Sequence, residues 1–237
     1  MSNAALRPGP HEVSRIRWSE PPQAILFDLD GTLADTAGDL GGALNHLRVA
    51  RGLPPMPLEE LRPYASAGAR GLIGVGLNIH PGHDEFETLR LGFLAAYSHC
   101  LADTTVLFDG FAEVLDAIEA AGLQWGVVTN KPHRFTLPVM DGLGLTQRAA
   151  VIVSGDTTAQ AKPHPLPLLT ACEQIGVAPA RTLYVGDDLR DIQAAIAAGM
   201  PSAAVRWGYI GHNGDIADWG ADVIAAHPRD LLGHLGL

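Results

Sequence analysis

Two carboxylates stand at the end of a short apolar run near the N-terminus. Asp28 and Asp30 follow the run Ala24–Phe27. Carboxylates at positions i and i+2 of an extended strand point to the same side of the chain, and the next residue, Gly31, lets the backbone turn away sharply. Because paired carboxylates repel each other unless a cation neutralises them, this pair indicates a cation site or a site of proton transfer.

A second acidic group follows the apolar run Thr182–Val185. Asp187 comes soon after this run, while Asp188 and Asp191 fall at the start of a predicted helix over 189–198. We expect Asp187 to be a metal ligand, and Asp188 and Asp191 either to serve the helix N-terminus or to support the metal site. Hard oxygen donors without a cluster of His or Cys favour magnesium over zinc.

Lysine is rare in this chain, since only two of the 16 basic residues are lysines. Lys131 follows Thr129 and Asn130 at the end of a second predicted strand, and Lys162 precedes a predicted helix. The hydroxyl and amide groups of Thr129 and Asn130 suit phosphate oxygens. Lys162 could neutralise a phosphate and an attacking carboxylate together. Taken singly, each of these residues is also ordinary turn or loop chemistry.

Short apolar runs, with helical patterns between them, predict the elements that position these residues. The runs are continuous enough to be buried strands of a parallel sheet. They are Ala24–Phe27, Trp125–Val128, Ala150–Val153, Thr182–Val185, Ala203–Val205 and Asp222–Ile224. One helix between them is predicted to begin at Asp109 and to end at Gly122. The alternation of strand and helix predicts a doubly wound α/β fold with a parallel sheet.

Residues 36–105 interrupt this alternation with helical patterns and no strand-like run. An insertion of about 70 residues is too long for a loop, so it predicts a small helical domain over the carboxyl edge of the sheet. Within it, Asp84 and Glu87 predict a capping box, and Gly71–Gly76 is expected to form a turn. The predicted organisation is a flexible tail (1–21), a core (22–36 and 107–237) and an inserted helical domain (37–106).

Composition excludes several classes of protein. With 47% hydrophobic and 18% charged residues, the 237-residue chain can bury a core. Its net charge of −10 and its lack of a basic run disfavour nucleic acid and anionic membranes as partners. It has no apolar stretch long enough to span a membrane, and two cysteines cannot build a disulfide framework. We therefore expect a cytoplasmic protein.

The four segments around Asp28, Thr129, Lys162 and Asp187 together resemble the motifs of the haloacid dehalogenase-type phosphohydrolase superfamily in order, approximate spacing and strand-end position. The resemblance extends from about Pro22 to the end of the chain. It implies a Rossmann-like core with an inserted α-helical cap domain. The activity that it implies is magnesium-dependent hydrolysis of a small phosphorylated metabolite, by a monomer or homodimer.

The resemblance also implies a role for each motif residue. Asp28 would be the nucleophile that forms an aspartyl-phosphate, and Asp30 would be the general acid and base. The transferred phosphoryl group would be held by Thr129, Asn130 and Lys162. Mg²⁺ would be bound by Asp28, the backbone carbonyl of Asp30, and Asp187. Asp188 and Asp191 would support these ligands without contacting the metal. Arg70, in the predicted cap, is the candidate contact to a substrate anion.

The substrate stays open between two classes. The overall pattern is similar to phosphoglycolate phosphatases, but several stretches are closer to N-acetylmuramic acid 6-phosphate phosphatases of bacterial cell-wall recycling. These stretches are 66–70, 125–132 with Arg134 and Phe135, 186–192, 205–210 and 219–223. A sugar phosphomutase, which would share the core and a similar cap, and a non-catalytic protein that binds a phosphorylated ligand are the further alternatives.

Overall fold

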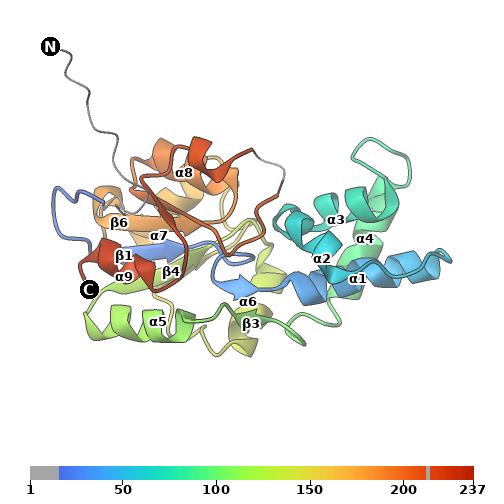
Figure 1. Cartoon of the computed structure of the whole chain (residues 1–237), viewed down its shortest axis with the longest axis horizontal. Helices are drawn as coiled ribbons and strands as arrows, with labels where there is room; N and C mark the ends of the chain where they lie inside the picture. The colour runs from blue at the N-terminus through green and yellow to red at the C-terminus, as the bar shows by residue number, and fades with distance from the viewer. Residues whose placement is uncertain (1–15, 212–213) are drawn as a thin grey trace, which may run out of the picture.

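The computed structural model describes residues 16–211 and 214–237, and it has two lobes (Figure 1). One lobe is a sheet with helices on both faces, and the other consists of helices α1 to α4. Of the predicted flexible tail, residues 1–15 lie outside the described residues. Within the described parts of the chain, no helix has the length and apolar character needed to cross a membrane.

The sheet contains six parallel strands among the described residues, in the order β5-β4-β1-β6-β7-β8. Their bounds are β1 Ala24–Phe27, β4 Gln124–Val128, β5 Val151–Val153, β6 Thr182–Gly186, β7 Ser202–Val205 and β8 Val223–Ala225. The bounds of each predicted apolar run differ from those of an observed strand by at most one residue at either end. The doubly wound α/β class is therefore confirmed.

Both faces of the sheet are buried, which explains why its strands are continuously apolar. Phe27 and its neighbour Trp125 point to one face, where the Phe27 ring lies 5.5 Å from that of Phe111. Leu26 and Tyr184 point to the other face. The first face is covered by α5 (Phe111–Ala120), α6 (His133–Gly142) and α9 (Asp230–Leu235), and the second by α7 (Leu166–Ile175) and α8 (Leu189–Ala198).

The second lobe is the helical insert, residues 37–105. It contains α1 Ala37–Ala50, α2 Leu58–Leu61, a 3₁₀ turn over Arg62–Ala67, α3 Gly68–Leu77 and α4 Phe86–Tyr97. At its root, β2 (Ala34–Asp35) pairs with β3 (Val106–Leu107) in a two-stranded antiparallel ribbon. The sequence did not predict this ribbon, because strands of two residues are too short to show a periodic pattern. Two further 3₁₀ turns span Pro179–Arg181 and Ile216–Asp218.

Tyr209, from the segment after β7, joins the root of the insert to the core. Its hydroxyl accepts the backbone N–H groups of Thr36 (2.6 Å) and Ala37 (2.9 Å) and donates to Oδ1 of Asp35 (2.7 Å). The Tyr209 side chain is buried, and burial together with the negative charge of Asp35 raises the pKa of its hydroxyl. The hydroxyl therefore stays protonated and fixes the start of α1.

Two predicted helix starts were wrong. Helix α5 is preceded by Gly110, whose φ of +86° suits glycine, and Asp109 does not cap it. Helix α4 follows Glu85 without a side-chain cap, and Glu87 bonds to Arg90 within the helix instead of closing a capping box. Asp109 thus lies one residue before the actual N-cap of α5, and the carboxylate of Glu87 has Arg90 as its partner.

The glycine-rich stretch Gly71–Gly76 was expected to be a turn, but it lies inside helix α3. The reason is close packing on α1. A Cβ atom added to Gly76 would lie 2.4 Å from the side chain of Leu44, so only glycine lets the two helices approach this closely.

Candidate active site

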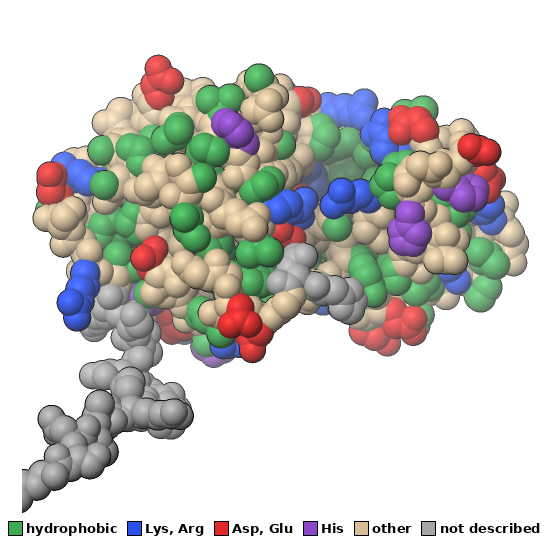
Figure 2. Space-filling model, turned by 90° about the horizontal axis from the view of Figure 1, so that it is seen from above, with side chains coloured by type: hydrophobic (Ala, Val, Ile, Leu, Met, Phe, Trp, Pro, Cys, Tyr) green, Lys and Arg blue, Asp and Glu red, His purple; other side chains and the backbone are tan. Residues whose placement is uncertain are grey.

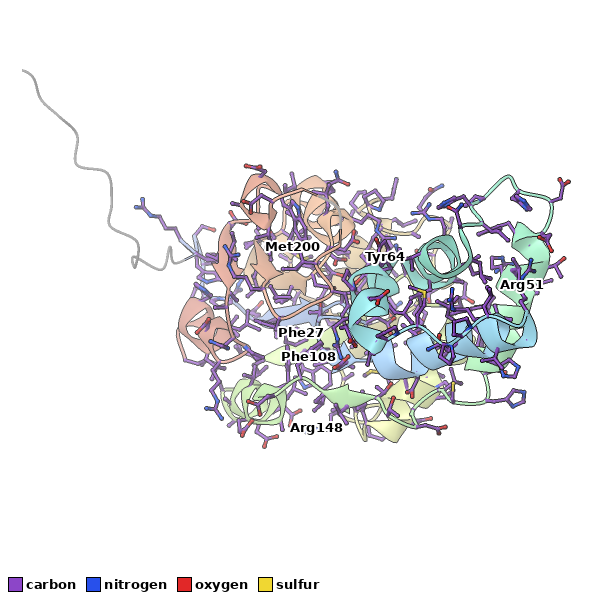
Figure 3. All side chains as sticks on the ribbon, turned by 45° about the vertical axis from the view of Figure 1, so that its right-hand side comes forward. Phe27, Arg51, Tyr64, Phe108, Arg148 and Met200 are labelled. Atoms are coloured by element: carbon purple, nitrogen blue, oxygen red, sulfur yellow. The ribbon has the colours of Figure 1, made fainter. Side chains whose placement is uncertain are left out.

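Three neighbouring strands bring the predicted site residues to one edge of the sheet. Strand β1 lies between β4 and β6, and the residues that directly follow β1, β4 and β6 are Asp28, Thr129 and Asp187. Because the carboxyl ends of parallel strands meet at the same edge, the side chains converge there. Figure 3 shows Tyr64 on the side of the helical insert that faces the sheet, and Phe27 within the sheet behind it.

A cavity of about 260 Å³ lies between this edge and the helical insert. Its core side contains Asp28, Asp30, Thr129, Asn130, Lys131 and Lys162. Its insert side is largely apolar, with Leu40, Phe93, Leu94 and Tyr97, and Phe135 of α6 continues this wall. Seen from above, a hollow separates the two lobes, and Lys and Arg side chains gather on both of its sides (Figure 2).

Three buried carboxylates form a tight cluster, and two of them, Asp28 and Asp191, line the cavity. Oxygen atoms of Asp28, Asp187 and Asp191 all lie within 4.8 Å of one another. Burial raises the pKa of Asp187 well above its usual range, and the charges of Asp28 and Asp191 raise it further. Burial also raises the pKa of Asp191 to about 6, although Lys162 opposes the shift. Burial and mutual repulsion therefore disfavour three ionised carboxylates in this cluster unless further positive charge is present.

Asp187 is oriented by donors from three segments. Its Oδ1 accepts the Thr32 hydroxyl (3.0 Å), and its Oδ2 accepts the Ser66 hydroxyl (2.9 Å) and the backbone N–H of Tyr209 (2.8 Å). Gly31 has a φ of +91°, and a Cβ atom there would lie 2.2 Å from Oδ2 of Asp187. The glycine after the Asp-x-Asp pair thus makes room for the third carboxylate.

This donor set fits a hard divalent cation. Carboxylate oxygens from separate segments are the ligands that magnesium prefers, and a divalent charge would offset both the burial and the mutual repulsion that raise these pKa values. The cluster differs in one member from the predicted ligand set, because the structure adds Asp191. The side chain of Asp30 faces away from it toward Thr36 and Lys131.

Lys162 links Asp28, the nucleophile candidate, to Asp191. Its Nζ lies 2.8 Å from Oδ1 of Asp28 and 2.7 Å from Oδ1 of Asp191, and it donates to the carbonyl of Val128 (2.9 Å). Burial lowers the pKa of Lys162, but Asp191 and Asp28 outweigh burial and raise it. The lysine therefore stays protonated while buried beside the phosphate-binding candidates.

Asn130 holds Lys162 in place through its side chain. The Asn130 amide donates to the backbone carbonyl of Lys162 (2.9 Å) and accepts its backbone N–H (2.9 Å). The Thr129 hydroxyl accepts the backbone N–H of Lys131 (3.1 Å). All three predicted phosphate-binding residues line the cavity. The side chain of Asn130 serves the loop, so its backbone is the part left for a ligand.

Asp188 and Asp191 both serve the N-terminus of α8. Asp188 accepts the backbone N–H of Arg190 (2.9 Å), and Asp191 accepts that of Asp188 (3.1 Å), which closes a capping box. Asp191 is also a member of the carboxylate cluster. The first alternative, a role at the helix N-terminus, is confirmed for both residues, and the support of a metal site by Asp191 stays a prediction. Arg190 bonds to Asp188 and to the carbonyl of Ser66 on the insert (3.0 Å).

The structure does not bring Arg70 to the cavity. Arg70 is exposed, and it is not among the residues that line the cavity. Arg90 of α4 and Arg190 of α8 line it instead. Sequence reasoning missed both arginines, because nothing in the spacing of a lone arginine distinguishes a cavity wall from a solvated helix face.

Lys131 is the other residue that sequence reasoning left without a role. Its Nζ lies 2.8 Å from Oδ1 of Asp30, and it is buried. The rarity of lysine was the available signal: the two lysines of the chain pair with the two aspartates of the Asp-x-Asp segment, Lys162 with Asp28 and Lys131 with Asp30.

Comparison with known proteins places this geometry in context. Residues 25–205 match the model of the haloacid dehalogenase-like hydrolase family. The chain is 47% identical over 210 residues to an N-acetylmuramic acid 6-phosphate phosphatase of Pseudomonas aeruginosa, covering 89% of this chain and 93% of that protein. It is also 47% identical over 210 residues to a phosphoglycolate phosphatase of Xanthomonas campestris, covering 89% and 95%.

The fold comparison agrees with the sequence comparison. The crystal structure of a predicted phosphoglycolate phosphatase from Haemophilus somnus superposes with a TM-score of 0.79 at 29% identity. The match covers 91% of this chain and 98% of that one, so it includes the helical insert as well as the sheet.

Proposed function

The chain belongs to the haloacid dehalogenase-like hydrolase family, and from this membership we propose that it is a magnesium-dependent phosphomonoesterase whose preferred substrate is N-acetylmuramic acid 6-phosphate. The observation that carries the hydrolase activity is the buried cluster of Asp28, Asp187 and Asp191, in which Lys162 pairs with Asp28 and Asp191 and these three residues line the cavity. The relatives named above are phosphatases of two kinds, and both kinds hydrolyse a phosphate monoester.

Magnesium would be held by the carboxylates of Asp28 and Asp187, with the backbone carbonyl of Asp30 and the carboxylate of Asp191 as further oxygen donors. When bound, it supplies positive charge next to the phosphoryl oxygens. Lys162 adds an ammonium group from the other side, and Thr129 and the backbone of Asn130 complete the phosphate site. These residues neutralise a dianion that the acidic chain would otherwise repel.

In the proposed reaction, a carboxylate oxygen of Asp28 attacks phosphorus, and the bond from phosphorus to the sugar oxygen breaks. That oxygen keeps the electron pair and takes a proton from Asp30. Water then attacks the aspartyl-phosphate and gives a proton to Asp30, which releases inorganic phosphate and restores Asp28. The helical insert, predicted as a cap over 37–106, would exclude bulk water during the first step.

The wall of the cavity favours the sugar phosphate. Leu40, Phe93, Leu94 and Phe135 form an apolar surface opposite the phosphate site. N-acetylmuramic acid carries an acetyl methyl group and a lactyl methyl group that can pack on such a surface, whereas phosphoglycolate has a single methylene. The sugar also carries a carboxylate, which Arg90 on the same side can meet.

2-Phosphoglycolate is the second candidate. The observation in its favour is the 47% identity to a relative with that name, which equals the identity to the N-acetylmuramic acid 6-phosphate phosphatase. An additional arginine at the cavity, Arg190, would suit its small carboxylate if released from Asp188.

The test is phosphate release with magnesium present, comparing kcat/KM for the two substrates in the wild type and in Asp28→Asn. We expect a preference of about tenfold or more for N-acetylmuramic acid 6-phosphate, since a few buried methyl groups supply that difference. Asp28→Asn should abolish turnover, whereas the exposed Asp109→Asn should not change it. A preference for 2-phosphoglycolate would reverse the substrate assignment, and no turnover of any phosphate ester would refute the hydrolase.

A further inference from the structure

Lys131 lies buried between the sheet edge and the helical insert. Its Nζ is 2.8 Å from Oδ1 of Asp30 and 4.6 Å from the centroid of the Tyr97 ring, and its side chain is only 5% exposed. An ammonium in such a place is costly unless its charge is balanced. The Asp30 carboxylate and the face of the Tyr97 ring supply that balance. One cation thus joins a catalytic candidate of the core to helix α4 of the insert.

The two oxygens of Asp30 have different surroundings. Oδ1 accepts hydrogen bonds from both Lys131 Nζ (2.8 Å) and the Thr36 hydroxyl (2.6 Å). Within the part of the chain that the structure describes, no hydrogen bond to Oδ2 is found, and Asp30 lines the cavity. Because two donors fix one oxygen, rotation of the carboxyl group is restricted and the other oxygen is left for a ligand.

We propose that Lys131 is a positioning residue that fixes the Asp30 carboxyl group for proton transfer to the leaving group, and that Tyr97 holds Lys131 in its buried place. This inference rests on the proposed function, in which Asp30 protonates the departing alcohol. It adds a link between the insert and the proton-transfer step. When the insert is seated, the Tyr97 ring closes over Lys131, and Lys131 keeps Asp30 in position.

Leaving-group dependence separates this role from a merely structural one. p-Nitrophenolate leaves readily without a proton, whereas the alkoxide of benzyl phosphate needs one. The two esters are similar in shape, so their binding differs little. kcat/KM covers the steps up to loss of the leaving group, so hydrolysis of the aspartyl-phosphate does not enter the comparison. Loss of a positioned acid therefore slows benzyl phosphate more than p-nitrophenyl phosphate.

The variant is Lys131→Met, in which an unbranched apolar side chain fills the same space. We expect its kcat/KM to fall about tenfold further for benzyl phosphate than for p-nitrophenyl phosphate. Lys162→Met is the matched control, since it removes the other buried lysine, whose partners are Asp28 and Asp191. Its losses should be equal for the two esters, because Lys162 serves the phosphoryl group and not the leaving group.

Tyr97 provides a second variant that keeps Lys131. Tyr97→Leu removes the ring face and should reproduce the leaving-group dependence in part, while Tyr97→Phe keeps the face and should show less of it. Circular dichroism and the melting temperature establish that each variant is folded. If Lys131→Met did not fold, the contrast between Tyr97→Leu and Tyr97→Phe would still decide the proposal.

Equal losses for both esters in Lys131→Met and in Tyr97→Leu would overturn the proposal, and so would a change confined to KM. Failure of the proposed function is distinguishable, because the wild type would then release phosphate from neither ester. The wild type could hydrolyse both esters while Lys131→Met loses kcat/KM equally for the two. That result would support the phosphatase activity and exclude a role of Lys131 in proton transfer.

Discussion

The hydroxyl of Ser66, on the helical insert, donates a hydrogen bond of 2.9 Å to Oδ2 of Asp187 at the end of β6. The same oxygen accepts the backbone N–H of Tyr209 at 2.8 Å. Asp187 is also one of the three carboxylates that form the candidate cation site. A residue of the insert therefore orients a candidate metal ligand of the core, and we expect cation binding to depend on the seating of the insert.

Ser66→Ala should weaken magnesium binding about tenfold, because residues that orient a ligand commonly contribute that much to metal affinity. The Ser66 hydroxyl also opposes the raised pKa of Asp187, so its loss favours the protonated form, which cannot bind a cation. Isothermal titration calorimetry with Mg²⁺ measures the change without substrate. Ser98→Ala, an exposed serine of the same insert, is the control and should bind as the wild type does. Equal affinity in both variants would contradict the coupling.

Magnesium should stabilise the protein more at about pH 8 than at about pH 5. Burial raises the pKa of Asp187 well above 3.8 and that of Asp191 to about 6. A folded state that holds protons more tightly than the unfolded chain is favoured at low pH. Without metal, these groups' contribution to stability is therefore lost as the pH rises from about 4 to above 6.

A divalent cation takes the place of those protons and restores the lost stability at high pH. The measurement is the melting temperature with Mg²⁺ and with a chelator at both pH values. Asp187→Asn gives the control, since an amide has no proton to lose and the pH dependence of the metal effect should shrink. A larger magnesium effect at the lower pH would show that the cluster is not the binding site.

The sheet and the core of the site were predictable because they depend on local patterns. Continuous apolar runs identify buried parallel strands, and the carboxyl ends of neighbouring strands must meet, so the convergence of Asp28, Thr129 and Asp187 follows from the order of the elements. The ribbon of β2 and β3 was not predictable from the sequence. Each of its strands has only two residues, and the pairing joins residues about 70 positions apart.

The insert's contribution to the site could not be read from spacing either. Ser66 acts through a contact with Asp187, far along the chain, and Arg90 lines a cavity between the insert and the core, so both positions exist only once the insert folds onto the core. Within the core, Lys131 and Asp30 are likewise far apart in the sequence. The capping box predicted from Asp84 and Glu87 fails for a different reason: a pattern of two residues does not fix where the helix begins.

Asp39→Asn should lower the free energy of unfolding by about 2 kcal/mol, since it weakens hydrogen bonds to a buried charge. The Asp39 carboxylate on α1 accepts the backbone N–H groups and the hydroxyls of Thr104 and Thr105, which joins the two ends of the insert. An amide can accept through one atom only. Urea denaturation measures the change, with the exposed Asp103→Asn as the control. Equal stabilities in the two variants would contradict the inferred role of Asp39.

Arg90, and not Arg70, should determine recognition of the substrate carboxylate. Arg90 lines the cavity, and its present partner is Glu87, an exposed carboxylate whose pairing contributes little, so the guanidinium can turn to a substrate at small cost. Arg90→Met should raise KM for N-acetylmuramic acid 6-phosphate about tenfold, which corresponds to a charged hydrogen bond of about 1.4 kcal/mol.

p-Nitrophenyl phosphate carries no second anion, so its KM should change much less in Arg90→Met. Arg70→Met is the matched control on the same insert, and because Arg70 is exposed and off the cavity wall, its KM for both substrates should equal that of the wild type. The opposite result would be a raised KM for the sugar phosphate in Arg70→Met and an unchanged KM in Arg90→Met. It would mean that the insert binds the substrate in another position and that the substrate carboxylate lies outside this cavity.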